Sequence, residues 1–211
     1  MENCNKKSRF YSVIYAMFAG IVKVLFNIRV INPENEPEEG GCLICANHVS
    51  ASDPVIICYA FKKNQAHFMA KKELFKIPLL RGLIKLLGAF PIDRGGADVS
   101  AIKKAIAMLK DKNSVGIFPQ GHRYKKVDPR TTPIKNGAGL ICNKAECDVV
   151  PVYILRKNNT FRLFKKTYVI IGEKIERSAL AGKENSELTD HIFDKVCTLG
   201  EKALNDPKIK L

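Results

Sequence analysis

A short polar segment between two apolar runs constrains this chain more than any other feature. Residues 42–46 are apolar, residues 47–54 (NHVSASDP) are mostly polar, and residues 55–57 are apolar again. We expect a strand that ends near residue 47 and a helix that begins near residue 53, because aspartate and proline suit the start of a helix. The polar side chains then lie at the end of a strand, where α/β proteins tend to hold their chemistry.

Within this segment, His48 and Asp53 form a candidate catalytic pair. A carboxylate that accepts the Nδ1 proton of a histidine fixes the tautomer and leaves Nε2 free to take a proton from a hydroxyl. This is part of a hydrolase triad without an evident nucleophile, so the hydroxyl of the substrate itself would attack. The alternative is a loop histidine without a chemical role and an aspartate that only caps the next helix.

The size and charge of the chain limit the classes to which it can belong. Its 211 residues suit a single α/β core. The 35 basic and 21 acidic residues give a formal net charge of +14, which favours a polyanionic partner, either nucleic acid or an anionic membrane. The aromatic residues do not decide between these partners, because they gather near the N-terminus and do not punctuate a basic groove.

The seven cysteines indicate reduced thiols in a protein that faces the cytosol. Cys42 and Cys45 have CxxC spacing, but both lie in the predicted strand before His48. No second pair follows with the spacing of a zinc site, so we expect no metal and no resident cofactor.

Residues 1–31 are predicted to form a basic and apolar membrane-associating helix. Residues 10–26 (FYSVIYAMFAGIVKVLF) are mainly apolar, but their length is at the lower limit for crossing a bilayer. We favour a helix that lies on or dips into the cytoplasmic leaflet; a membrane span and a packed core helix are the alternatives. Residues 32–41 (NPENEPEEGG) are predicted to be a linker, so the catalytic domain is expected at residues 42–211.

Apolar periodicity predicts further elements in this domain. The expected strands are 67–70, 114–118, 149–155 and 167–171, the last one near an edge of the sheet, and the expected helices are 54–62, 98–110, 135–147 and 186–205. His67 is expected to be a strand residue without a catalytic role. Residues 73–87 combine leucine and isoleucine with cations, which predicts either a core helix with a solvated face or a membrane-contacting helix.

Two further polar clusters follow predicted strands. Residues 88–96 (GAFPIDRGG) are predicted to form a strand that delivers Arg94 to a glycine-rich turn, where a guanidinium can bind a phosphate through two hydrogen bonds. Residues 118–123 (FPQGHR) place a glycine amide where it can donate to an oxyanion, and Arg123 can hold a second phosphate oxygen. The alternatives are a surface ion pair at Arg94 and an ordinary basic turn at Arg123.

Taken together in chain order, these blocks resemble the glycerolipid acyltransferases, specifically the 1-acyl-glycerol-3-phosphate acyltransferases. One block alone is weak support, whereas several in order are specific. The matching blocks are NHxSxxDP at 47–54, AKKELFKIPLL at 70–80, GAFPIDR at 88–94, FPQGHR at 118–123, KNGA at 135–138 and VVPVYI at 149–154.

The resemblance implies a single-domain α/β fold with a mixed, mostly parallel β-sheet flanked by helices. It implies that His48, oriented by Asp53, deprotonates the sn-2 hydroxyl of 1-acyl-glycerol-3-phosphate, which then attacks an acyl thioester directly. Acyl-CoA or acyl-carrier protein is the implied donor, and amides near Gly121 are candidate oxyanion donors. The implied substrate-binding residues are Asn47, Arg94, Gln120, Gly121 and Arg123, of which the two arginines bind the acceptor phosphate.

The FPQGHR block at 118–123 departs from the usual FPEGTR, because Gln120 and His122 replace a glutamate and a threonine. Glutamine keeps the acceptor oxygen and loses the charge, so a hydrogen-bonding role survives and an electrostatic one does not.

The expected partners are lysophosphatidic acid, the acyl donor and an anionic membrane surface, without nucleic acid, at the cytoplasmic face of a bacterial membrane. Three alternatives stay open: another lysophospholipid or glycerol-3-phosphate as acceptor, a non-catalytic basic module that binds membrane or nucleic acid, and a hydrolase whose nucleophile is Ser50 or Cys45.

Overall fold

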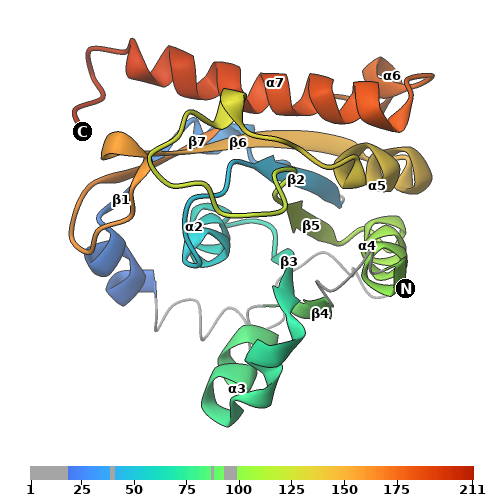
Figure 1. Ribbon diagram of the computed structural model, residues 1–211, viewed down its shortest axis with the longest axis horizontal. Coiled ribbons are helices and arrows are strands. Elements are labelled where there is room, and N and C mark those ends of the chain that lie inside the picture. The colour runs from blue at the N-terminus through green and yellow to red at the C-terminus, as the bar shows by residue number, and fades with distance from the viewer. Residues whose placement is uncertain (1–18, 39–40, 87, 93–98) are drawn as a thin grey trace.

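The computed structural model describes residues 19–38, 41–86, 88–92 and 99–211, and its centre is a seven-stranded sheet with the order β1-β7-β6-β2-β5-β3-β4 (Figure 1). Neighbouring strands are parallel except for the antiparallel pair β6 and β7. The predicted fold class, a mixed and mostly parallel sheet flanked by helices, is confirmed. The strands are β1 (Ile28–Ile31), β2 (Cys42–Ala46), β3 (Ala66–Lys71), β4 (Phe90–Ile92), β5 (Ser114–Ile117), β6 (Asp148–Arg156) and β7 (Thr167–Ile171).

Helices cover both faces of this sheet. On one face, α4, α5 and α7 pack over the strands, and α7 runs along the top of Figure 1 above β6 and β7. On the other face lie α2 and a helix at residues 19–26 that leads into β1. The named helices are α2 (Asp53–Ala60), α3 (Pro78–Leu86), α4 (Val99–Lys110), α5 (Gly137–Ala145), α6 (Arg177–Leu180) and α7 (Asn185–Leu204), and the 3-10 turns are η1 (Pro33–Asn35), η2 (Lys72–Lys76), η3 (Pro129–Thr131) and η4 (Lys157–Asn159).

Strand β2 is uniformly apolar because both of its faces are buried. Leu43 and Cys45 belong to the core cluster under α4, α5 and α7, whereas Cys42, Ile44 and Ala46 belong to the cluster under α2. A parallel strand with helices on both sides has no solvent face and therefore shows no alternation of polar and apolar residues. The apolar run thus marks a central strand, which pairs with β5 on one side and β6 on the other.

The predicted domain boundary at residue 42 is wrong. Strand β1 pairs in parallel with β7 and forms an edge of the sheet. The expectation that β7 lies near an edge is met only in that it is the second strand; the edge itself is β1. Residues 32–38 are not a free linker either, because the buried carboxylate of Glu36 accepts hydrogen bonds from the amides of Lys62, Lys63 and Asn64 at 2.6–2.8 Å. The domain therefore includes residues from 28 onward.

The predicted membrane-associating helix lies only partly within the described residues. Its described part, residues 19–26, is helical and packs Val22 and Phe26 against the core. Among the helices that the structure describes, none combines the length and the apolar character needed to cross a bilayer. In residues 73–87 the helix α3 begins at Pro78, and several leucine side chains of this helix lie outside the described set.

Candidate active site

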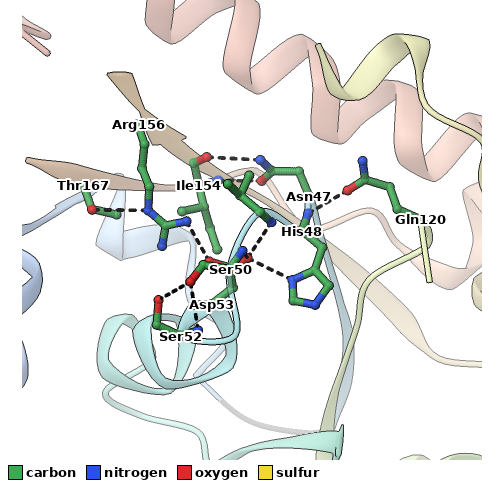
Figure 2. Close-up of polar contacts among 10 residues, drawn as sticks. Asn47, His48, Ser50, Ser52, Asp53, Gln120, Ile154, Arg156 and Thr167 are labelled. Carbon is green, nitrogen blue, oxygen red and sulfur yellow. Dashed lines mark hydrogen bonds and ion pairs between the residues drawn. The ribbon is translucent and has the colours of Figure 1, made fainter. Parts of the chain in front are cut away.

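The connection between β2 and α2 is held together by the carboxylate of Asp53 (Figure 2). Its Oδ2 accepts hydrogen bonds from the backbone amides of Val49 and Ser50, each at 2.7 Å, and lies 2.9 Å from Nδ1 of His48. Asp53 is the first residue of α2, yet its side chain turns back toward the preceding residues and binds no amide of the helix. The interpretation of Asp53 as an ordinary helix cap therefore does not describe this geometry.

The imidazole of His48 is fixed in one orientation. An ionised carboxylate can only accept, so Nδ1 carries the proton that it donates to Asp53, and Nε2 is left as an acceptor. Nε2 has no hydrogen-bond partner within the described part of the chain. The ring stacks on Phe118 with centroids 4.0 Å apart and planes 13° apart, and Phe118 in turn stacks on Phe68. This is the geometry of a general base whose reactive nitrogen is free.

Arg156, which was not predicted from the sequence as a site residue, completes this arrangement. Strand β6 extends beyond the end of β2, so its last residue reaches the start of α2 (Figure 2). The Nη1 of Arg156 lies 2.8 Å from Oδ1 of Asp53, and both side chains are at most 2% exposed. Nε donates to the hydroxyl of Thr167 at 3.4 Å. The available signal was a cation directly after an uninterrupted apolar run, a place where arginine rarely stays buried without a partner.

The environment of Asp53 keeps it ionised. Burial by itself raises the pKa of a carboxyl group, but the hydrogen bond from His48, the charge of Arg156 and the amide of Ser50 act in the opposite direction. These interactions outweigh burial, so the pKa of Asp53 lies below its ordinary value. The carboxylate is therefore present to stabilise an imidazolium at His48.

Asn47 and Gln120 were predicted to bind substrate, and the structure places both in the framework instead. Asn47 is fully buried and pairs with both backbone groups of Ile154, which fastens the end of β2 to β6. Gln120 is 2% exposed; its Oε1 accepts from the amide of His48 at 2.6 Å and its Nε2 donates to Thr132 at 2.7 Å. Gln120 holds the backbone of His48 directly, whereas Asn47 holds the preceding position of the chain against β6. The polar groups of both side chains are engaged in these hydrogen bonds.

The turn after β5 lies against the same histidine. Gly121 has φ +66°, and a Cβ there would lie 3.0 Å from the stem of Lys135, so both conformation and space favour glycine. Its amide donates to the carbonyl of Phe118 at 2.9 Å, which leaves the next amides of the turn as the candidate oxyanion donors. The amide of Tyr124 donates to the carbonyl of His48 at 2.9 Å, and the residue before Tyr124 is the exposed Arg123.

Other predicted residues are placed as follows. Arg94 lies outside the described residues. His67 is a β3 residue, as predicted, and its Nδ1 lies 2.9 Å from the carbonyl of Gly88. Burial raises the pKa of the Cys45 thiol well above its ordinary value, and the hydroxyl of Ser50 pairs with that of Ser52 at 2.9 Å. Neither proposed nucleophile of a hydrolase is therefore activated by His48.

The known proteins that this chain resembles are acyltransferases. Residues 27–155 match the sequence model of the family described as Acyltransferase. The chain is 33% identical over 180 residues to a 1-acyl-sn-glycerol-3-phosphate acyltransferase of Bacillus subtilis, which covers 82% of this chain and 88% of that protein. It is 28% identical over 195 residues to the protein of the same name from Borreliella burgdorferi, covering 86% of this chain and 77% of that one.

A solved structure shares the fold. The crystal structure of the 1-acyl-sn-glycerophosphate acyltransferase from Thermotoga maritima superposes with a TM-score of 0.74 over 95% of this chain and 83% of that chain. The sequence identity is 23%, so this likeness speaks for the architecture alone.

Proposed function

Because this chain belongs to the acyltransferase family, we propose that it transfers a fatty acyl group from an acyl thioester to the sn-2 hydroxyl of 1-acyl-glycerol-3-phosphate. The product is phosphatidic acid, an intermediate of phospholipid biosynthesis. One observation supports the chemistry most directly: Nδ1 of His48 lies 2.9 Å from Asp53, which leaves Nε2 free to accept a proton.

In the proposed reaction, Nε2 of His48 takes the proton of the acceptor hydroxyl while that oxygen attacks the thioester carbonyl. The tetrahedral intermediate then collapses, the bond between carbon and sulfur breaks, and the imidazolium returns its proton to the departing thiolate. Asp53 stabilises the imidazolium between these two steps. Holding the two substrates in place supplies roughly 7–11 kcal/mol, which exceeds the effect of the base.

The substrate charges are proposed to meet the cations around the turn after β5. Arg123 is exposed and directly precedes Tyr124, whose amide bonds to the carbonyl of His48, so it suits the phosphate of the acceptor. Lys135, whose stem lies near Gly121, extends the same cationic surface. Arg94 remains a predicted phosphate ligand. The amides that follow Gly121 are the proposed donors to the oxyanion.

The test is an assay of purified chain with 1-acyl-glycerol-3-phosphate and either acyl-CoA or acyl-carrier protein, followed by mass spectrometry of the lipid product. We expect His48→Ala to lower turnover by about 10²–10⁴-fold, the usual contribution of a positioned base. His191→Ala, on α7 and remote from the site, is the matched control and should keep turnover within about twofold. Turnover that survives His48→Ala would exclude the mechanism.

Direct attack also predicts that no acyl-enzyme forms. After a pulse of donor without acceptor, intact-mass measurement should show only the unmodified chain. An acyl adduct on Ser50 or Cys45 would replace this proposal with the hydrolase interpretation.

A further inference from the structure

Two neighbouring segments carry large apolar side chains that face solvent. In the connection between β6 and β7, Leu163 and Phe164 are 53% and 60% exposed. In the helix at residues 19–26, Ile21 and Val24 are 53% and 66% exposed, and they lie three positions apart on one side of the helix. Isolated exposed apolar residues need no explanation, whereas a cluster of them indicates an interaction surface.

The two segments are joined to each other. The amide of Phe164 donates to the carbonyl of Leu25 at 2.8 Å, and the side chain of Asn27 donates to the carbonyl of Phe164 at 3.3 Å. The rings of Phe26 and Phe161 lie 5.4 Å apart. Phe164 is held by these bonds at φ +61°, a conformation that is strained for a phenylalanine. Figure 1 shows the connection beside this helix, at the left of the molecule.

The charged residues within the two segments are all basic. The connection contains Lys157, Arg162, Lys165 and Lys166, and neither residues 19–31 nor residues 157–166 contain aspartate or glutamate. A hollow of about 1140 Å³ opens beside the connection; these four cations line it together with Lys126, and its acidic lining residues are Asp128 and Glu201. Apolar side chains surrounded by cations suit the boundary between lipid headgroups and acyl chains.

We propose that the connection at residues 157–166 and the helix at residues 19–26 together form a docking surface for an anionic bilayer. Leu163, Phe164, Ile21 and Val24 insert among the lipids, and the cations of the connection bind headgroup phosphates. A nucleic acid fits less well, because three of these four apolar side chains are aliphatic and offer no ring for base stacking.

This surface is connected to the candidate active site through the chain and through backbone hydrogen bonds. Arg156, which binds Asp53, immediately precedes the connection. The amide of Lys126 donates to the carbonyl of Asn159 within the connection at 3.1 Å, and Tyr124, two residues before Lys126, donates to His48. The inference rests on the proposed function in one respect: if the acceptor is a lysolipid, docking here holds His48 near the bilayer that contains it.

The direct test measures sedimentation of the full chain with vesicles of phosphatidylglycerol or of phosphatidylcholine. The wild-type chain should bind the anionic vesicles at least about tenfold more tightly. The double variant Leu163→Gln/Phe164→Asn should weaken that binding at least about tenfold with an unchanged melting temperature, because both side chains are exposed and asparagine tolerates a positive φ. Arg162→Gln/Lys165→Gln should weaken it by a similar factor.

Matched controls lie elsewhere on the surface. Val99→Gln, at the start of α4 and 56% exposed, controls for loss of an exposed apolar side chain. Lys195→Gln/Lys202→Gln, on the exposed side of α7, controls for the loss of two charges. Both should bind anionic vesicles within about twofold of the wild-type chain.

The outcomes separate this inference from the proposed function. Acyl transfer to an acceptor in vesicles should fall about tenfold in the docking variants, whereas transfer to a short-chain monomeric acceptor should not change. Variant-dependent vesicle binding without any acyl transfer would support the surface and refute the proposed function. Undiminished vesicle binding by both double variants would overturn the inference. A lower melting temperature of the double variants with unchanged vesicle binding would also overturn it. An equal loss of acyl transfer to the vesicle acceptor and to the monomeric acceptor would overturn it too, and would assign the surface to the acyl donor.

Discussion

At the scale of single residues, the decisive interaction is the buried pair of Asp53 and Arg156. Removing a charge pair from water costs free energy, and the geometry must recover that cost through hydrogen bonds. Here Asp53 uses both oxygens, one on Arg156 and the other on His48 and two backbone amides. Arg156 does not touch the reacting atoms in the proposed mechanism; it positions the carboxylate that positions the base.

We expect Arg156→Met to destabilise the protein by about 3–5 kcal/mol at pH 7, because a buried carboxylate then loses its partner. Urea unfolding measures this effect. Arg130→Met is the matched control: Arg130 binds Asp194 and Glu201 at the surface, where it is 40% exposed, so its loss should cost only about 0–1 kcal/mol. Equal costs at the two positions would contradict the importance of the buried pair.

The same variant should shift the acid limb of stability. The pKa of Asp53 is lowered in the folded chain, so this group contributes stability above its unfolded pKa of about 3.9, and the contribution is lost as pH falls through the folded pKa. Without Arg156, one of the interactions that offset burial is lost, so the pKa of Asp53 rises. The loss of stability should therefore begin at a higher pH than in the wild-type chain. Unfolding free energies measured from about pH 3 to pH 7 give both profiles, and coincident profiles would argue against this coupling.

At the scale of elements, helix α7 covers the strand that ends in Arg156. It packs on β6 at Gly200, where a Cβ would lie 2.4 Å from the ring of Tyr153. The missing side chain lets the helix approach the strand closely, and Tyr153 fills the space. This contact holds the strand that positions Arg156.

Gly200→Ala should therefore destabilise the fold by about 1–3 kcal/mol, the usual cost of overpacking. Gly82→Ala, in α3, meets no other atom within 4 Å and should instead stabilise by about 0.5–1 kcal/mol, because alanine favours a helix. Thermal unfolding followed by circular dichroism separates the two. If both variants changed the melting temperature in the same direction, close packing of α7 on β6 would not explain the effect of Gly200→Ala.

At the scale of the whole molecule, the chain has a formal net charge of +14, which includes the cations of the proposed docking surface. Electrostatic attraction between exposed charges is screened within about 10 Å at 0.1 M salt and about 3 Å at 1 M. Binding to phosphatidylglycerol vesicles should weaken by at least about tenfold between these two salt concentrations. Binding to phosphatidylcholine vesicles is the control and should hardly change; equal salt responses would exclude an electrostatic contribution.

The sequence by itself determined the local elements around the site. The uniformly apolar residues 42–46 and the Asp53-Pro54 pair predicted a strand followed by a helix, and β2 and α2 occupy these positions. Their spacing also indicated that His48 and Asp53 can meet, because only a short connection separates them. Such features are local: they depend on neighbours in the chain and on periodicity, which a single sequence displays.

Only the tertiary structure decided which distant residues share the site. Arg156 follows Asp53 by 103 positions and meets it because β6 runs past the end of β2. Likewise, Asn47 and Gln120 have the polar character of ligands, yet both are buried and bond to backbone groups, Asn47 to Ile154 and Gln120 to His48. Strand β1 was not predicted, because its partner β7 is far away in the sequence. Burial and partner choice depend on long-range packing, and no local pattern encodes them.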